Sequence, residues 1–329
     1  MFTCRICGNS QNQTYYKALD LVQGTKDEFD YVECSECGCV QLKELITDLS
    51  KYYDEDYYSF KKPRKKNFLR DNPLKRFLLG KRAEAYLGNK NFFGNFLLSF
   101  TKPPKILKKF DGLNISRNSS VLDIGCGKKA RILNKLASEG FTDLQGADPF
   151  LKEDITFSNG VKLYKKSIED MPTDKLYDFI VLSHTLEHVD NPVEILTELS
   201  KRLTPNGLAI IDIPMIGNPW KEYKTFWTGV HAPHHISLHT MKSMEIVVSK
   251  TPLKINDIKF ISVGAVYWGS ELFKKGYTLP EFKRNDSLIK KYFTPEQLKA
   301  FDEKALEDNR NKQGDTAVYI LKKKHSQKS

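Results

Sequence analysis

The sequence contains no run of about 18 apolar residues, which excludes a transmembrane helix by the usual length criterion. It opens with MFTCR and lacks the charged stretch followed by an apolar one that marks a secretory signal. We therefore expect a cytoplasmic protein, with peripheral contact at the inner face of the membrane as the alternative. Its 329 residues, 40% hydrophobic and 28% charged, are typical of about two globular domains.

A basic character spread over the whole chain is also missing. The 52 Lys and Arg residues outnumber the 41 Asp and Glu residues, for a net charge of +11. Residues 61–109 hold 15 basic residues and only two acids, Asp71 and Glu84, a net charge of +13. The remainder has 37 basic and 39 acidic residues, a net charge of −2. The charge therefore belongs to one segment, and general nucleic-acid binding is not indicated.

Four of the six cysteines form two C-x2-C pairs, each followed by glycine: Cys4, Cys7, Cys34 and Cys37. In a reducing compartment such pairs bind metal more often than they form disulfides. Two pairs complete the tetrahedral shell of a structural Zn²⁺ site, so we predict a zinc-ribbon-like module over residues 1–50. The spacer holds a hairpin with YY (15–16) and YV (31–32) as strand residues, and Cys39 is a fifth thiol that competes as a ligand.

Residues 51–112 mix Lys and Arg with Phe and Leu, and Pro63, Pro73 and the pair Pro103-Pro104 divide them into short helices. We predict a basic amphipathic helical linker or lid. Three interpretations stay open. The segment lies on anionic lipid, or it binds the phosphates of a nucleotide-linked or lipid-linked substrate or of RNA, or its phenylalanines pack on the main domain while its lysines are solvated.

From about residue 118 short apolar runs alternate with helical stretches. A helix is predicted over 129–138, and another begins well at Asn191-Pro192. This alternation predicts an α/β fold with a Rossmann-like, doubly wound, mostly parallel seven-stranded sheet over 113–322, with an insertion at 269–314 and a polar tail at 323–329. The predicted strands are 121–124, 144–147, 161–164, 179–182, 208–213, 255–261 and 317–321.

A glycine loop follows the first predicted strand, and Asp148 ends the second. Such a loop lets a ligand approach the backbone, and the acid can accept hydrogen bonds from ribose hydroxyls. Gly125, Gly127 and Ala130 also fit the dinucleotide fingerprint. However, Asp123 would repel a pyrophosphate and can engage the ammonium of a methionine moiety, which favours S-adenosylmethionine (SAM) over NAD.

Four segments resemble successive motifs of the class I SAM-dependent methyltransferases, in the family's order and spacing: VLDIGCG (121–127), GADP (146–149), YDFIVLSHTLEHV (177–189) and LTPNG (203–207). The resemblance covers about residues 118–265. It implies that Asp123, Gly125 and Gly127 line the methionine side and that Asp148 holds the ribose. It further implies that Ser167 and Ile168 flank the adenine, and that Ser183 and His184 close the pocket. Lys129 and Ser167 depart from the family pattern.

The cysteine pairs followed by such a domain resemble zinc-containing methyltransferases that act on sugars and polysaccharides. This resemblance implies a small-molecule or glycan acceptor, in a nucleotide- or lipid-linked form or free. The sugar C-methyltransferases of that group carry a long C-terminal domain, whereas here only the polar tail follows the last predicted strand, so we expect methylation of a hydroxyl rather than of carbon. A sugar C-methyltransferase, an rRNA or tRNA base methyltransferase and a SAM-binding scaffold without turnover are the alternatives. The oligomeric state is not indicated.

Four of the seven histidines fall within 231–239, after the fifth main strand, where substrate loops emerge in this fold. A hydroxyl acceptor benefits from a general base, commonly His. We therefore predict His235 as base or acceptor contact, with His231 and His234 next. A second metal site is conceivable here, but the surrounding sequence offers no clear carboxylate ligand.

Overall fold

The structure is a computed structural model that describes residues 2–46, 52, 73–88, 91–101, 105–283 and 286–324. The Lys-rich run at 61–66, Pro103-Pro104 and the tail beyond residue 324 lie outside the described residues. The chain divides into two compact units. Unit 1 is Met1–Asp54, His184–Glu194 and Ile211–Ile320, and unit 2 is Glu55–Ser183, Ile195–Ile210 and Leu321–Ser329. Strands β9 (Leu203–Pro214) and β12 (Thr316–Lys323) contribute residues to both.

The sheet of unit 2 runs in the order β9-β8-β4-β5-β7-β6. Its centre is β4 (Val121–Ile124), whose four residues are all buried and which pairs in parallel with β5 (Leu144–Ala147) and β8 (Tyr177–Ser183). Next come β7 (Lys162–Tyr164), parallel to β5, and β6 (Ile155–Thr156), antiparallel to β7. The apolar run of β4 is typical of a strand that helices cover on both faces.

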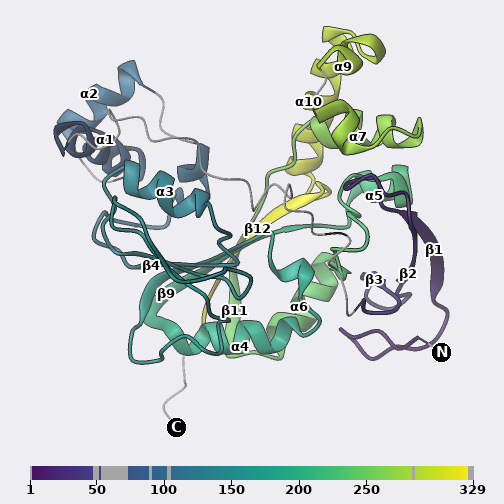
Figure 1. The fold of residues 1–329 in the computed structure, drawn as a ribbon, viewed down its shortest axis with the longest axis horizontal. Coiled ribbons are helices and arrows are strands. Elements are labelled where there is room, and N and C mark those ends of the chain that lie inside the picture. Colours follow the sequence, from purple (N-terminus) through teal and green to yellow (C-terminus); the bar gives the residue numbers. More distant parts are fainter. Residues whose placement is uncertain are drawn as a thin grey trace. The chain divides into compact units, whose positions relative to one another are not determined.

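Helix α3 (Arg131–Ser138) packs against β4 and β5 with Leu133, Leu136 and Ala137 buried (Figure 1). Unit 2 also contains α1 (Pro73–Tyr86), α2 (Phe92–Phe100) and η3 (Lys105–Phe110) from the basic segment. Helix α1 is tied to the end of α3 by Arg82, which donates two hydrogen bonds to the Glu139 carboxylate at 2.7 and 2.8 Å. One cation of this segment is therefore a buried structural group.

Unit 1 contains a second, four-stranded sheet in the order β1-β2-β3-β10. Strands β1 (Thr14–Leu19), β2 (Glu28–Glu33) and β3 (Val40–Leu42) are antiparallel, and β10 (Ser237–Leu238) adds to β3. The unit further contains β11 (Leu253–Phe260), which precedes β12 and β9 in sheet order. Its helices are η4 (Leu186–His188), α5 (Asn218–Tyr223), η5 (Lys224–Phe226), α6 (Met241–Ser249), α7 (Ala265–Lys274), α8 (Leu279–Lys283), α9 (Asp286–Tyr292) and α10 (Pro295–Arg310). Helix α4 (Pro192–Arg202) begins in unit 1 and continues in unit 2.

The mostly parallel, Rossmann-like α/β fold is confirmed. Each predicted strand has its counterpart, although β9 is longer than expected, and β6 was not foreseen because two residues carry no periodicity. The hairpin between the cysteine pairs is present as β1 and β2. The predicted domain boundaries at residues 50, 112 and 322 remain predictions. No helix among the described residues is long and apolar enough to cross a membrane.

Candidate functional site

The glycine loop follows β4 and turns sharply into α3. Gly125 and Gly127 have φ of 71° and 60°, in the left-handed region that glycine adopts without strain. The Gly125 N–H donates to the Ala147 carbonyl at 2.8 Å, so the loop is fixed to the end of β5. The loop therefore brings bare backbone to the carboxyl ends of two neighbouring parallel strands, where ligands bind in open α/β sheets.

Asp148 lies at the end of β5 and is itself bound to this loop. Its Oδ2 accepts the Gly127 N–H and its Oδ1 accepts the Phe150 N–H, both at 2.9 Å. Each carboxylate oxygen keeps further acceptor capacity. The carboxylate is thus held in place by the backbone and is still able to accept two hydroxyl donors, as a ribose diol requires.

Asp123, the third residue of β4, has only 3% of its surface exposed. Burial raises the pKa of this carboxyl to about 7, with Asp148 raising and Lys109 lowering it to smaller extents. A carboxyl with this pKa changes charge near neutrality and gains from a cationic ligand. In the same unit, Lys109 Nζ donates to Ser183 Oγ at 2.9 Å at the end of β8.

The predicted adenine contacts lie in the loop after β7. Ile168 is buried, and Ser167 Oγ donates to Asp170 at 2.9 Å. The loop is held by Arg202, a residue that we did not predict. Its buried guanidinium donates to the Met171 carbonyl at 3.1 Å and to the Glu169 carbonyl at 3.0 Å. Glu198, four residues earlier in the same helix, is its local partner, but nothing local marks Arg202 as the support of this loop, because the loop carbonyls lie more than 30 residues away.

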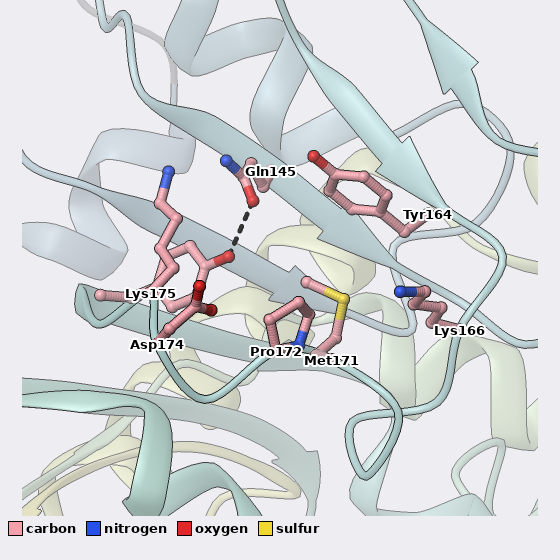
Figure 2. Close-up of a pocket in the computed structure, with 8 residues that line it drawn as sticks. Gln145, Tyr164, Lys166, Met171, Pro172, Asp174 and Lys175 are labelled. Atoms are coloured by element: carbon pink, nitrogen blue, oxygen red, sulfur yellow. Dashed lines mark hydrogen bonds between the residues drawn. The ribbon is translucent and has the colours of Figure 1, made fainter.

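A small pocket in unit 2 is lined by residues from β5, β7, β8 and the loop before β8 (Figure 2). Gln145 and Tyr164 face it, and the Tyr177 hydroxyl donates to Gln145 Oε1 at 2.7 Å. None of the predicted cofactor residues lines this pocket. We therefore assign it no part in the cofactor site.

The histidines of 231–239 gather in unit 1. His231 lies with its ring centroid 4.7 Å from that of His234 and 4.8 Å from that of His235. The segment that carries them ends in β10, the fourth strand of the N-terminal sheet. The Tyr31 hydroxyl of β2 also donates to the His235 carbonyl at 2.9 Å. The N-terminal module therefore holds the histidine segment in place.

Two of these rings are partly fixed by backbone carbonyls. His235 Nδ1 donates to the Gly229 carbonyl at 2.8 Å, and His234 Nε2 donates to the Tyr52 carbonyl at 2.9 Å. Burial lowers the pKa of His231 and His235 well below the usual value and that of His234 to about 4. Near neutral pH all three rings are uncharged and offer lone pairs to a hydroxyl or a cation, although the lowered pKa values make them weak bases.

Glu187 in η4 is a residue that the histidine prediction missed. It is fully buried, with Oε1 3.3 Å from His184 Nδ1 and 3.9 Å from His235 Nε2. The expectation that the cluster has no carboxylate partner was wrong, since chain folding brings in a residue 48 positions from His235. The LEHV run at 186–189 carried the signal, but only the fold shows that it meets the histidines. His184, expected over the methionine, is 49% exposed and also lies 3.8 Å from Asp212.

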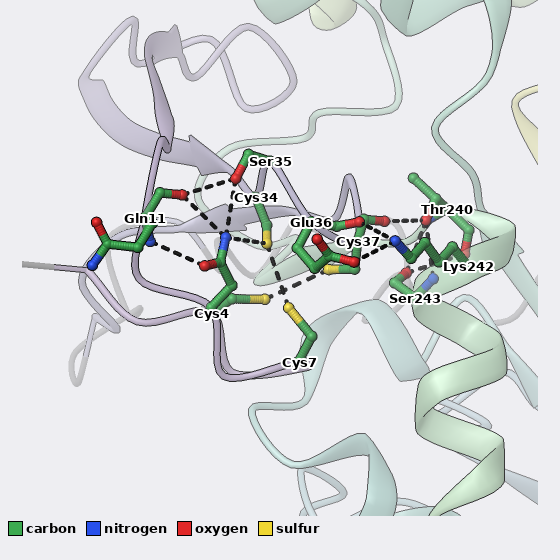
Figure 3. Close-up of polar contacts among 11 residues, drawn as sticks. Cys4, Cys7, Gln11, Cys34, Ser35, Glu36, Cys37, Thr240, Lys242 and Ser243 are labelled. Carbon is green, nitrogen blue, oxygen red and sulfur yellow. Dashed lines mark hydrogen bonds and ion pairs between the residues drawn. The ribbon is translucent and has the colours of Figure 1, made fainter.

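The four predicted metal ligands come together in the N-terminal module (Figure 3). The sulfurs of Cys4 and Cys37 are 3.6 Å apart and those of Cys7 and Cys34 are 3.5 Å apart. Four sulfurs about 2.3 Å from one zinc ion lie roughly 3.8 Å from each other, so the spacing fits a tetrahedral shell. Cys39 is buried outside this group.

Amide donors and a helix cap surround the cysteines. Gln41 Nε2 donates to Cys4 Sγ at 2.9 Å, and the hydrogen bond from Cys37 lowers the pKa of Cys4 to about 4. The Cys37 carbonyl accepts the hydroxyl of Thr240, which also caps α6 (Figure 3). Such outer contacts orient metal ligands, and the cluster therefore fits a closed structural site.

Comparison with known proteins places the glycine loop and its strands in a family. Residues 97–255 match the family model described as a methyltransferase domain. A ubiquinone biosynthesis O-methyltransferase of Rickettsia conorii is 30% identical over 167 residues, 45% of this chain and 54% of that protein. The same enzyme of Rickettsia canadensis is 26% identical over 191 residues, 53% of this chain and 73% of that protein. The chain thus spans about half the length of the first of these relatives.

Solved structures are similar to this chain at lower sequence identity. The plantazolicin methyltransferase BpumL, solved with SAH, is 17% identical with a TM-score of 0.39 over 78% of this chain and 87% of its own. The geranyl diphosphate C-methyltransferase of Streptomyces coelicolor is 11% identical with a TM-score of 0.43 over 77% of this chain and 100% of its own. Residues 97–255, just under half of the chain, thus match a methyltransferase domain, and the motifs within them resemble those of SAM-dependent methyltransferases.

Proposed function

We propose that this protein transfers a methyl group from SAM to a hydroxyl of a small-molecule or glycan acceptor, most specifically a sugar or polysaccharide precursor in free, nucleotide-linked or lipid-linked form. The observation that carries the proposal is the position of the Asp148 carboxylate, whose Oδ2 accepts the Gly127 N–H of the glycine loop at 2.9 Å. The O-methyltransferase names of the relatives favour oxygen over carbon as the acceptor atom.

SAM supplies an activated methyl group, so the protein's main task is alignment and proton removal. Gly125 and Gly127 leave room for the methionine moiety, and Asp123 in its ionised form attracts the ammonium. Asp148 orients the ribose, Ser167 and Ile168 contact the adenine, and Ser183 and His184 limit the methionine end. His235, with His231 and His234 next, is the acceptor contact or the base that receives the hydroxyl proton.

We propose that Cys4, Cys7, Cys34 and Cys37 hold a structural Zn²⁺ ion. A shell of four thiolates leaves no open position for substrate. The role of the ion is to fix the N-terminal sheet, whose β3 carries β10 and hence the histidine segment.

We also propose that α2 contacts an anionic membrane surface. Phe92 and Phe100 are 91% and 73% exposed on this helix, and Phe93 and Phe96 are about half exposed. The surrounding sequence carries a net charge of +13 over residues 61–109. Aromatic side chains combined with basic residues favour the interface of an anionic bilayer.

The acceptor is tested by incubating the protein with methyl-labelled SAM and fractionated metabolites, glycans and RNA. We expect label in an O-methyl group of a small molecule or glycan. Asp148→Asn should bind SAM at least about 10-fold more weakly in calorimetry, while Glu153→Gln, an exposed acid nearby in sequence, serves as the matched control. Label on carbon or in RNA contradicts the hydroxyl proposal. Absence of SAM binding contradicts the enzyme proposal altogether.

A further inference from the structure

We propose that Glu187, His188 and His235 form a second metal site, which takes one divalent cation of the zinc or manganese type. One ligand atom from each of the three residues lies within 4.8 Å of the other two. The site is separate from the four cysteines and uses a different donor chemistry: two imidazole nitrogens and a carboxylate oxygen.

The hydrogen bonds of the two rings fix which nitrogen is free. His235 Nδ1 faces the Gly229 carbonyl at 2.8 Å, and His188 Nδ1 faces the His234 carbonyl at 2.8 Å. A carbonyl accepts only, so both rings carry their proton on Nδ1. In the neutral ring Nε2 then presents a lone pair, and in His235 this atom points at Glu187 Oε1 from 3.9 Å.

The carboxylate oxygen Oε1 of Glu187 and the Nε2 lone pair of His235 face each other, and both are hydrogen-bond acceptors, so neither satisfies the other. Glu187 is fully buried, and its Oε2 has no hydrogen-bond partner among the described residues. Within the same part of the chain its Oε1 has only His184 Nδ1 at 3.3 Å, and leaving a buried carboxylate oxygen without a partner is costly. A cation bound between the three ligand atoms accepts the lone pairs of both rings and neutralises the charge of the carboxylate.

The surroundings match those of metal ligands in other proteins. Ligating histidines usually donate their second N–H to a carbonyl or carboxylate, which fixes the ring, and both rings do so here. In a tetrahedral shell with metal–ligand distances of about 2.1 Å the ligand atoms lie roughly 3.4 Å apart, so atoms that are now up to 4.8 Å apart have to close by roughly 1.4 Å at most. Two histidines with one carboxylate suit zinc, manganese or iron and leave coordination positions open.

The open coordination position can bind the hydroxyl of an acceptor. This part of the inference rests on the proposed function. An acceptor hydroxyl bound there would have its pKa lowered, since a cation favours the alkoxide. As the oxygen forms its bond to the methyl carbon, the carbon–sulfur bond breaks, its electron pair stays on sulfur, and the hydroxyl proton passes to solvent water. His184, with Nδ1 3.3 Å from Glu187, lies next to the site as a positioning residue.

Mn²⁺ is the probe of choice, because it prefers oxygen and nitrogen to thiolate ligands and so leaves the cysteine site aside. We titrate the full-length, zinc-loaded protein with Mn²⁺ and follow the free ion by electron paramagnetic resonance. We expect one equivalent bound to the wild type and at least about 10-fold weaker binding in Glu187→Gln and His235→Ala. Glu194→Gln, an exposed acid on α4, should bind as the wild type does.

Thermal unfolding with and without Mn²⁺ gives a second readout that does not depend on a folded variant. A bound ion should raise the Tm of the wild type and leave that of Glu187→Gln unchanged. No Mn²⁺ binding and no Tm rise in the wild type overturns the proposal, as does equal binding in Glu187→Gln. Because neither measurement involves methyl transfer, a metal-free result leaves SAM binding and acceptor labelling as separate tests of the proposed function.

Discussion

Two carboxylates lie at the ends of neighbouring parallel strands, Asp123 in β4 and Asp148 after β5, and both belong to the proposed cofactor site. Asp148 is bound by two backbone N–H groups and is ready to accept hydroxyls. Asp123 lies deeper, where burial raises its pKa to about 7. One acid is therefore a fixed acceptor, and the other responds to the charge of its ligand.

The raised pKa of Asp123 makes SAM binding depend on pH. Below about pH 7 the carboxyl is protonated and loses its attraction for an ammonium, so the affinity for SAM should fall by up to about 10-fold per pH unit. Calorimetry between pH 5.5 and 8.5 measures this change. Asp123→Asn should bind weakly with a flat profile, and a steep profile in that variant would show that another group titrates.

The same pKa has a consequence for stability. A carboxyl whose pKa is higher in the folded than in the unfolded state is protonated on folding between its two pKa values. In the absence of ligand, the contribution of this group to the free energy of unfolding therefore falls as pH rises from about 4 to about 7, and the folded protein becomes less stable. Denaturant unfolding of wild type and Asp123→Asn should show a smaller decline with pH in the variant.

His235 is the residue with the strongest predicted effect on turnover. Its Nε2 faces Glu187 and its Nδ1 is held by Gly229, so His235→Ala should lower turnover by about 10²-fold or more. His239→Asn is the comparison, because His239 is buried and its Nδ1 contacts only Ser243 among the hydrogen bonds shown for that ring. Near-normal activity of His235→Ala, at an unchanged circular-dichroism spectrum, rejects the role.

At the scale of elements, α2 differs from the other helices in what it exposes. Its sequence FFGNFLLSF carries no charge, and Gly94 is its buried residue, packed against the Lys81 carbonyl where a side chain would not fit. Close approach to α1 through Gly94 leaves the phenylalanines on the outer face. Helix propensity does not require this exposure, and the exposed phenylalanines are the reason for the proposed contact with an anionic membrane.

Replacing Phe92, Phe96 and Phe100 with Ser should weaken binding to phosphatidylglycerol vesicles by at least about 10-fold, because buried aromatic area and charge act together. Vesicle sedimentation measures the effect, and phosphatidylcholine vesicles should bind little of the wild type. Leu306→Ser, an exposed residue of α10, is the control substitution. Equal sedimentation of the triple variant and wild type contradicts the membrane proposal.

For the whole molecule, the predicted site residues divide between the two units. The glycine loop, Asp123, Asp148, Ser167, Ile168 and Ser183 belong to unit 2. The cysteine cluster, the histidine segment and Glu187 belong to unit 1. Cofactor binding and acceptor chemistry should therefore respond to different substitutions.

Cys34→Ser tests this division. It should leave less than half an equivalent of zinc, lower the Tm and reduce turnover by about 10-fold or more, because β10 loses the support of β3. The affinity for SAM should stay within about 2-fold of the wild type. Cys39→Ser, a buried thiol outside the cluster, should keep its zinc. A wild type that itself contains less than half an equivalent of zinc rejects the metal prediction.

The sequence by itself determined the strands, the glycine loop, the acid after β5 and the cysteine pairs. Each of these features is encoded by residues that are close together in the sequence. Examples are the periodicity of apolar residues, a glycine with positive φ and the turn of a C-x2-C pair. The helix start at Asn191-Pro192 is another such case, and α4 begins at Pro192.

Only the tertiary structure decided which distant groups meet. Arg202 supports the loop at 169–171 across more than 30 residues, and β10 joins β3 across almost 200. Glu187 meets His235 because both are carried to the same place by unrelated elements. A single sequence does not encode such pairings locally, since they follow from the packing of whole strands and helices, and the buried carboxylate among the histidines became visible only there.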